Sequence, residues 1–150
     1  MIETTFRIAE RTDLEALVQF MREYYEFDHL PFDEQNARTA LENFVGNEFL
    51  GRVWLIQYEG ETVGYVVLTL GYSLEYGGRD AFVDEVYIRE SHRGRGIGQR
   101  TLSFVEDVCR SLNVRALHLE VERANTGAHA VYRKTGFVDH DRYLMTKRIP

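Results

Sequence analysis

Apolar residues recur every three or four positions in several stretches of the chain, as in Leu14, Leu17, Val18 and Met21. This spacing places them on one face of an amphipathic helix. A capping-box sequence that begins at Thr12 indicates where the first helix starts. The pattern as a whole predicts four helices, over about residues 12–25, 33–46, 99–112 and 126–134.

Stretches rich in Val, Ile, Tyr and Trp, some with alternating polar positions, predict the strands. We expect strands over residues 4–9, 52–59, 62–70, 81–89, 114–122 and 137–149, with a loop over residues 70–80. The two stretches on either side of Gly60 are typical of an antiparallel hairpin. The order β, α, α, β, β, β, α, β, α, β predicts a mixed α/β architecture whose sheet becomes parallel after residue 89.

Composition narrows the class of protein. A chain of 150 residues with 44% hydrophobic and 28% charged residues fits one globular domain over residues 1–150. The chain has no apolar run of about 20 residues and no signal-peptide pattern, so we expect no membrane association and a cytoplasmic location. The net charge of −6 argues against nucleic acid as a partner. The single cysteine and the scattered histidines lack metal-ligand spacing, so we expect no metal.

The glycine-rich run Arg93-Gly94-Arg95-Gly96-Ile97-Gly98 lies between a predicted strand and a predicted helix. Such a turn points several backbone N–H groups at one spot, with the positive end of the helix dipole behind them, and so favours a diphosphate ligand. A Walker A loop would need Lys and Ser or Thr where Gln99 and Arg100 stand, and the glycine spacing differs from that of a dinucleotide-binding fold. The run therefore predicts an anion site of another kind, in preference to a plain flexible turn.

Residues 23–37 combine carboxylates with aromatic side chains and contain no Lys or Arg. Carboxylates and aromatic rings together attract an ammonium group by charge and by cation–π interaction. Tyr25, Glu26 and Asp28 are our candidates for binding a cationic substrate, although acidic residues at a helix end are also common on ordinary solvated surfaces.

The chain resembles the GNAT superfamily of N-acetyltransferases. Residues 93–98 are similar to the family's R/Q-x-x-G-x-G/A loop, and residues 125–137 to its N-x-x-A-x-x-x-Y-x-x-x-G-F segment. Residues 6–14 and 61–65 follow the family's order. The resemblance implies a mixed, mostly antiparallel sheet of 6–7 strands, flanked by about four helices and splayed between two central parallel strands.

The resemblance also implies acetyl-coenzyme A (acetyl-CoA) as co-substrate. The strand before the loop would pair its backbone with the pantetheine arm, and the loop would hold the diphosphate. The residues implied in cofactor binding are Val86, Tyr87, Ile88, Arg93, Gly94, Arg95, Gly96, Ile97, Gly98, Gln99, Asn125 and Tyr132. Asn125 could equally be a plain helix cap. Dimers are common among proteins of this family, so a homodimer is a further expectation.

An alkyl ammonium with a pKa of about 10.4 must lose a proton before it attacks a thioester. Asp84 stands where the polyamine N-acetyltransferases that this chain resembles carry a catalytic glutamate, and it is also a candidate acceptor ligand. Glu85 is a second candidate for the chemistry, and strand alternation predicts that the two carboxylates face opposite sides of the sheet. Tyr132 matches the family's general acid for the departing thiolate, with a buried aromatic as the alternative.

The expected function is direct acetyl transfer, in a ternary complex, to the primary amine of a small cationic acceptor. Two alternatives stay open at this point. One is a protein lysine or N-terminal acetyltransferase, which would favour an open groove. The other is a non-catalytic acyl-CoA binding or sensing module.

Overall fold

In a computed structural model, which describes residues 3–150, the chain separates into two units. The first unit ends at Leu119 and contains the whole sheet and three of the helices. The second unit is Glu120–Pro150 and contains α4 (Thr126–Lys134). In the described part of the chain, no helix is both long and apolar enough to cross a membrane.

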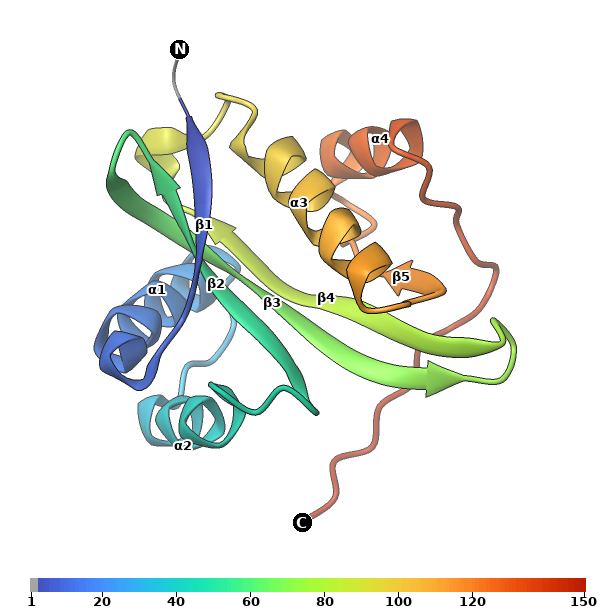
Figure 1. Ribbon diagram of the computed structural model, residues 1–150, viewed down its shortest axis with the longest axis horizontal. Helices are drawn as coiled ribbons and strands as arrows, with labels where there is room; N and C mark the ends of the chain where they lie inside the picture. Colours follow the sequence, from blue (N-terminus) through green and yellow to red (C-terminus); the bar gives the residue numbers. More distant parts are fainter. Residues whose placement is uncertain (1–2) are drawn as a thin grey trace. The chain divides into compact units, whose positions relative to one another are not determined.

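The sheet of the first unit has five strands in the order β1-β2-β3-β4-β5 (Figure 1). The first four strands are antiparallel neighbours, and β5 runs parallel to β4. The strands are β1 (Thr4–Ile8), β2 (Gly51–Tyr58), β3 (Glu61–Ser73), β4 (Gly78–Ile88) and β5 (Ala116–His118). The predicted antiparallel hairpin around Gly60 is therefore confirmed.

Helices cover both faces of this sheet. Alternate residues of β2 face opposite sides of the sheet. On one side, Val53 and Leu55 belong to the core that residues of α1 (Leu14–Phe27) and α2 (Glu34–Phe44) also form. Trp54 lies between them in sequence and packs edge-on, at 5.1 Å between ring centroids, against Phe104 of α3 (Ile97–Ser111). With α4 in the second unit, the four expected helices are confirmed.

Three expectations about the sheet are wrong. It has five strands among the described residues instead of 6–7, because residues 137–149 form no strand. The expected strand over residues 114–122 shrinks to Ala116–His118 and lies at the sheet edge instead of its centre. The expected loop over residues 70–80 is mostly strand, since β3 and β4 continue to a short turn after Ser73. A stretch with strand propensity forms a strand only where a second strand pairs with it. Residues 71–73 and 78–80 pair with each other, residues 116–118 pair with β4, and residues 137–149 form no strand.

The helix starts follow side-chain capping. The Asp33 carboxylate accepts the backbone N–H of Asn36 at 3.1 Å, as the sequence predicts for the start of α2. The cap before α1 differs from the expected one at Thr12, because Asp13 accepts the backbone N–H of Glu10 at 2.8 Å instead. The same Asp13 carboxylate pairs with Arg7 of β1, and this ion pair lowers the pKa of Asp13.

Candidate active site

The glycine-rich run forms the connection from β4 to the start of α3. Gly94 and Gly96 have φ angles of +76° and +79°, in the left-handed region that favours glycine. Gly96 is the N-cap residue of α3, so the first backbone N–H groups of the helix follow directly after it. These N–H groups have no partner within a helix of this geometry, and with the helix dipole they suit an anion.

The arginines of this run make contacts of their own. The Nε atom of Arg93 donates to the Ile88 carbonyl at 2.9 Å, and its guanidinium lies 4.0 Å from the centre of the Phe27 ring. Arg95 lies over the Tyr58 ring at 5.6 Å. All of residues 93–96 are exposed, so the run is open to a ligand. A diphosphate role for Arg93 or Arg95 stays a prediction.

Beyond Phe82, β4 has a free edge among the residues of the first unit that the structure describes. The parallel pairing with β5 covers only Asp80, Ala81 and Phe82. Alternate residues of an antiparallel strand direct their backbone polar groups to opposite sides. Because the N–H of Arg89 donates to the Val63 carbonyl of β3 at 2.8 Å, Val86 and Ile88 direct theirs away from β3. The early end of β5 thus leaves backbone groups of the strand predicted to pair with pantetheine available for a ligand.

A β-bulge interrupts β4 at Asp84. Val83 lies opposite Leu68 and Glu85 lies opposite Val67, so Asp84 has no opposite residue on β3. Leu68 and Val67 face opposite sides of the sheet, so Val83 and Glu85 do too, and Asp84 between them breaks the regular alternation. The charge of Asp84 raises the pKa of Tyr25 of α1 as well as the pKa of Glu85, which indicates that both carboxylates lie on the side covered by α1. The expectation that alternation sends these carboxylates to opposite faces is wrong.

The two carboxylates have different surroundings. Asp84 is exposed to solvent, yet the protein around it raises the pKa of its carboxyl by desolvation. Glu85 is half-buried and accepts hydrogen bonds from the hydroxyls of Tyr25 at 2.6 Å and Tyr65 at 2.7 Å. Desolvation raises the pKa of Glu85, the charge of Asp84 raises it further, and the two tyrosine hydrogen bonds act against that rise.

Tyr65 was missed by the sequence reasoning. Its ring is fully buried, and in sequence it stands next to other buried residues of β3, Val63, Val66 and Val67. A tyrosine in such an apolar strand is a usable signal, because a buried hydroxyl normally has a hydrogen-bond partner. The partner itself, 20 positions along the chain, requires the strand pairing to be known.

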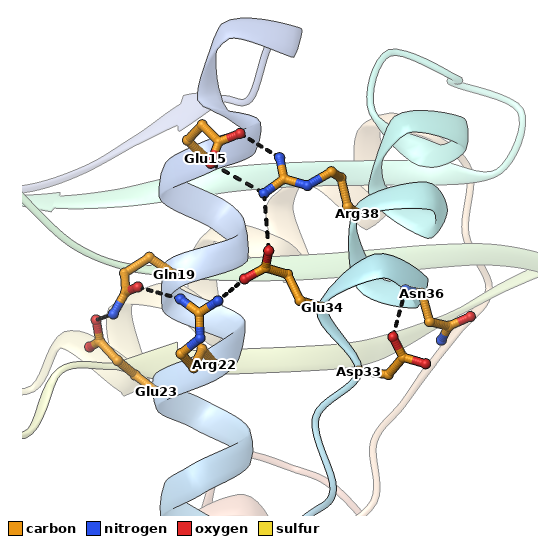
Figure 2. Close-up of polar contacts among 8 residues, drawn as sticks. All are labelled: Glu15, Gln19, Arg22, Glu23, Asp33, Glu34, Asn36 and Arg38. Atoms are coloured by element: carbon orange, nitrogen blue, oxygen red, sulfur yellow. Dashed lines mark hydrogen bonds and ion pairs between the residues drawn. The ribbon is translucent and has the colours of Figure 1, made fainter.

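Most of the acidic segment between residues 23 and 37 is paired with arginines from outside it or used as a cap. Figure 2 shows Arg22 of α1 and Arg38 of α2 meeting Glu34, while Arg38 also pairs with Glu15. Glu23 pairs with Arg89 at 3.0 Å. Two of the predicted substrate residues, Glu26 and Asp28, are exposed at the end of α1. The third, Tyr25, is in contact with the carboxylates of β4 through Glu85.

Asn125 and Tyr132 belong to the second unit. The Asn125 side chain accepts the backbone N–H of Ala128 at 3.2 Å, so it is the N-cap of α4. Tyr132 is half-buried, its ring lies 6.0 Å from the Phe137 ring, and burial raises the pKa of its hydroxyl. Their proposed roles in cofactor binding and catalysis stay predictions. Among residues 3–150, no cluster of three or more His, Cys, Asp or Glu side chains could hold a metal ion.

Comparison with known proteins settles the family. The model of the acetyltransferase (GNAT) family matches residues 14–137. The chain belongs to the GNAT family of acetyltransferases. This GNAT match crosses the boundary between the two units, and a single domain over residues 1–150 stays a prediction.

Relatives agree with this GNAT assignment. The chain is 28% identical to the mouse (Mus musculus) thialysine N-epsilon-acetyltransferase over 149 residues, which covers 93% of this chain and 86% of the mouse protein. An integron cassette protein from a salt-marsh metagenome is 37% identical, with a TM-score of 0.85 and coverage of 97% and 90%. A predicted acetyltransferase from Clostridium acetobutylicum, solved with acetyl-CoA, shares the fold at a TM-score of 0.80, with 18% identity and coverage of 97% and 96%.

Proposed function

We propose that this GNAT protein transfers the acetyl group of acetyl-CoA to the primary amine of a small cationic acceptor. The observation that carries the proposal is Asp84, an exposed carboxylate set by a bulge beside the free edge of β4. A solvent-accessible carboxylate of raised pKa is a better proton acceptor than an ordinary surface aspartate. It lies on the strand whose far end leads into the glycine-rich run.

Acetyl-CoA fits the donor side of this arrangement. The outward backbone groups of Val86 and Ile88 can pair with the amides of the pantetheine arm as an added strand would. The N–H groups from Gly94 to Gln99 can hold the diphosphate at the start of α3. The strand and the run adjoin, so one extended ligand can use both.

The reaction follows from these positions. The acceptor ammonium gives a proton to Asp84 through a bridging water, and the free amine nitrogen attacks the thioester carbonyl carbon. The new C–N bond forms and the C–S bond breaks, and the nitrogen loses its second proton to solvent. Tyr132 protonates the departing thiolate and regains its proton from water. The products are the N-acetyl amine and free coenzyme A.

A small cationic acceptor is favoured by the charge of this side of the sheet. Asp84 and Glu85 are neighbours on β4, the Tyr25 hydroxyl donates to Glu85, and the Tyr25 ring packs edge-on against the Phe32 ring at 5.5 Å between centroids. Carboxylates beside aromatic rings attract an ammonium group. The mouse relative, named for the epsilon amine of thialysine, supports an acceptor of this class.

The direct test is an amine panel assayed by release of free thiol from acetyl-CoA. The panel holds diamines, polyamines, basic amino acids, aminoglycosides and a lysine-containing peptide. We expect the best kcat/KM with a small amine that carries a second positive charge. A clear preference for the peptide, or no thiol release with any small amine, would contradict the proposed acceptor class.

Replacing Tyr132 by phenylalanine tests the general acid. Tyr132→Phe keeps the ring that contacts Phe137 and removes the hydroxyl. We expect kcat to fall by about 10- to 100-fold, with the KM of acetyl-CoA little changed, because the lost proton donor acts mainly on the transition state. The measurement is steady-state kinetics with the best amine of the panel. Tyr143→Phe, which removes an exposed hydroxyl from the same unit, is the control. A Tyr132→Phe variant with unchanged kcat would end this assignment.

A further inference from the structure

The bulge in β4 does more than expose one carboxylate. Without it, Asp84 and Glu85 would lie on opposite faces of the sheet, as consecutive strand residues do. With it, the alternation is broken at Asp84, and Asp84 acts on both Tyr25 and Glu85 on the α1 side; Asp84 is exposed and Glu85 is half-buried. The charge of Asp84 raises the pKa of the neighbouring Glu85 carboxyl, so the ionisation of one carboxylate affects that of the other.

Glu85 is held from two directions. Its Oε2 atom accepts the hydroxyl of Tyr25 from α1, and its Oε1 atom accepts the hydroxyl of Tyr65 from β3. Each carboxylate oxygen thus has its own donor, which stabilises the ionised form. Among residues 3–150, the Asp84 carboxylate has no such side-chain donor.

Within residues 3–150, the other ionisable groups on this side of the sheet leave Asp84 and Glu85 without a positively charged partner. Those that face the pair or the tyrosines around it are Glu23, Tyr24, Tyr25, Tyr65, Tyr87 and Arg89. Glu23 and Arg89 pair with each other, and the Tyr87 hydroxyl donates to Glu23 at 3.3 Å. No positive charge among the described residues pairs with Asp84 or Glu85, so the pair presents net negative charge toward the proposed acceptor site.

We propose that Asp84 and Glu85 work as one coupled pair, in which Glu85 is a positioning residue whose charge, held by Tyr25 and Tyr65, strengthens Asp84 as the base. This inference rests on the proposed function. Below the pH at which the pair takes up its first proton, the negative charge on Glu85 or Asp84 is lost and proton abstraction slows. The acid limb of the rate profile therefore belongs to the pair.

The direction of each influence on the pKa of Glu85 supports this reading. Desolvation and the charge of Asp84 raise the pKa, and the tyrosine hydrogen bonds lower it. Tyr25 and Tyr65 show the reciprocal effect, since burial and the Glu85 carboxylate raise the pKa of both hydroxyls. Both tyrosines therefore stay protonated and remain donors at neutral pH.

Two substitutions should move the acid limb in opposite directions. Glu85→Gln keeps an acceptor oxygen for a tyrosine and removes the charge, so the acid limb of kcat/KM should shift by about one unit to lower pH. Tyr65→Phe removes one donor, so Glu85 takes up its proton more easily and the limb should shift to higher pH. A residue with only a structural role would change the height of the profile and leave the limb in place.

The experiment is the pH dependence of kcat/KM for the amine, from pH 5 to 9, for wild type and both variants. Asp107→Asn, which removes one charge from an exposed pair on α3, is the matched control and should leave the limb unmoved. Limbs that coincide for wild type, Glu85→Gln and Tyr65→Phe would overturn the coupling.

A titration of the wild-type protein keeps the inference testable if both variants fail to fold. Carbon-13 NMR of the side-chain carboxyls should show a two-step titration at Asp84 and Glu85, each step felt by both residues. Two independent single-step curves would overturn the pair. This measurement needs no acceptor, so it separates a failure of the pair from a failure of the proposed amine acetylation.

Discussion

Asp84→Asn is expected to lower kcat/KM for the amine by about 10² to 10⁴-fold, the range of a lost general base. The asparagine side chain has nearly the same shape and cannot take a proton at neutral pH. Its effect should be largest on the plateau of the pH profile, since the wild-type rate falls as pH decreases through the raised pKa of Asp84. The measurement is the pH profile of kcat/KM by thiol release.

Stability provides the internal check on this variant. Because the pKa of Asp84 is raised in the folded protein, ionising it costs folding free energy at pH values above its ordinary pKa. Asp84→Asn removes that cost, so its thermal unfolding temperature at pH 7 should equal or exceed that of wild type. Asp107→Asn serves again as the charge-matched control with normal activity. Full activity of Asp84→Asn across the pH range would contradict Asp84 as the base.

The sequence predicts the local elements of this fold well, because periodicity and capping act over a few residues. The stripe of Leu17, Val18 and Met21 is buried in α1, and Asp33 caps α2 as expected. The strands that fail are those that depend on distant partners. Residues 137–149 contain Tyr143, Leu144 and Met145, but propensity alone does not supply a neighbouring strand.

Within the candidate site, too, the features set by local sequence were predicted and those set by strand pairing were not. The glycine-rich run and the start of α3 follow from local sequence, since left-handed turns need glycine. The relation between Asp84 and Glu85 does not, because a bulge is a property of two paired strands and alternation along one strand cannot reveal it. Arg93 shows the same limit, since Phe27, which it contacts, comes from α1.

Pairing also changes how the acidic segment is understood. Its lack of Lys and Arg predicts a free cation-binding surface. In the structure, Glu23 forms an ion pair with Arg89, and Glu34 forms ion pairs with arginines of α1 and α2. Counting charges within one segment cannot predict these ion pairs, because the arginines come from outside the segment and only the fold brings them close. The acceptor prediction therefore moves from the segment as a whole to the place where Tyr25 meets the carboxylates of β4.

Gly96→Val is expected to weaken acetyl-CoA binding by about tenfold or more, which corresponds to about 1.4 kcal/mol. Gly96 has a φ of +79° at the N-cap of α3, where a β-branched residue is strained by an amount of that order or larger. Relief of the strain must rotate the backbone and turn N–H groups away from the diphosphate. The measurement is calorimetric titration of acetyl-CoA into each protein.

Gly60→Val makes the decisive comparison with Gly96→Val. Gly60 also has a φ of +79°, and a side chain added there would meet no atom within 4 Å of its Cβ. It lies in the turn between β2 and β3, outside the glycine-rich run. Both substitutions should destabilise the protein through the same backbone strain, which thermal unfolding can verify. Only Gly96→Val should lose affinity, because only its N–H neighbours face the proposed diphosphate. Equal affinities for the two variants would show that the glycine-rich run serves chain geometry alone, and the donor site would then have to lie elsewhere.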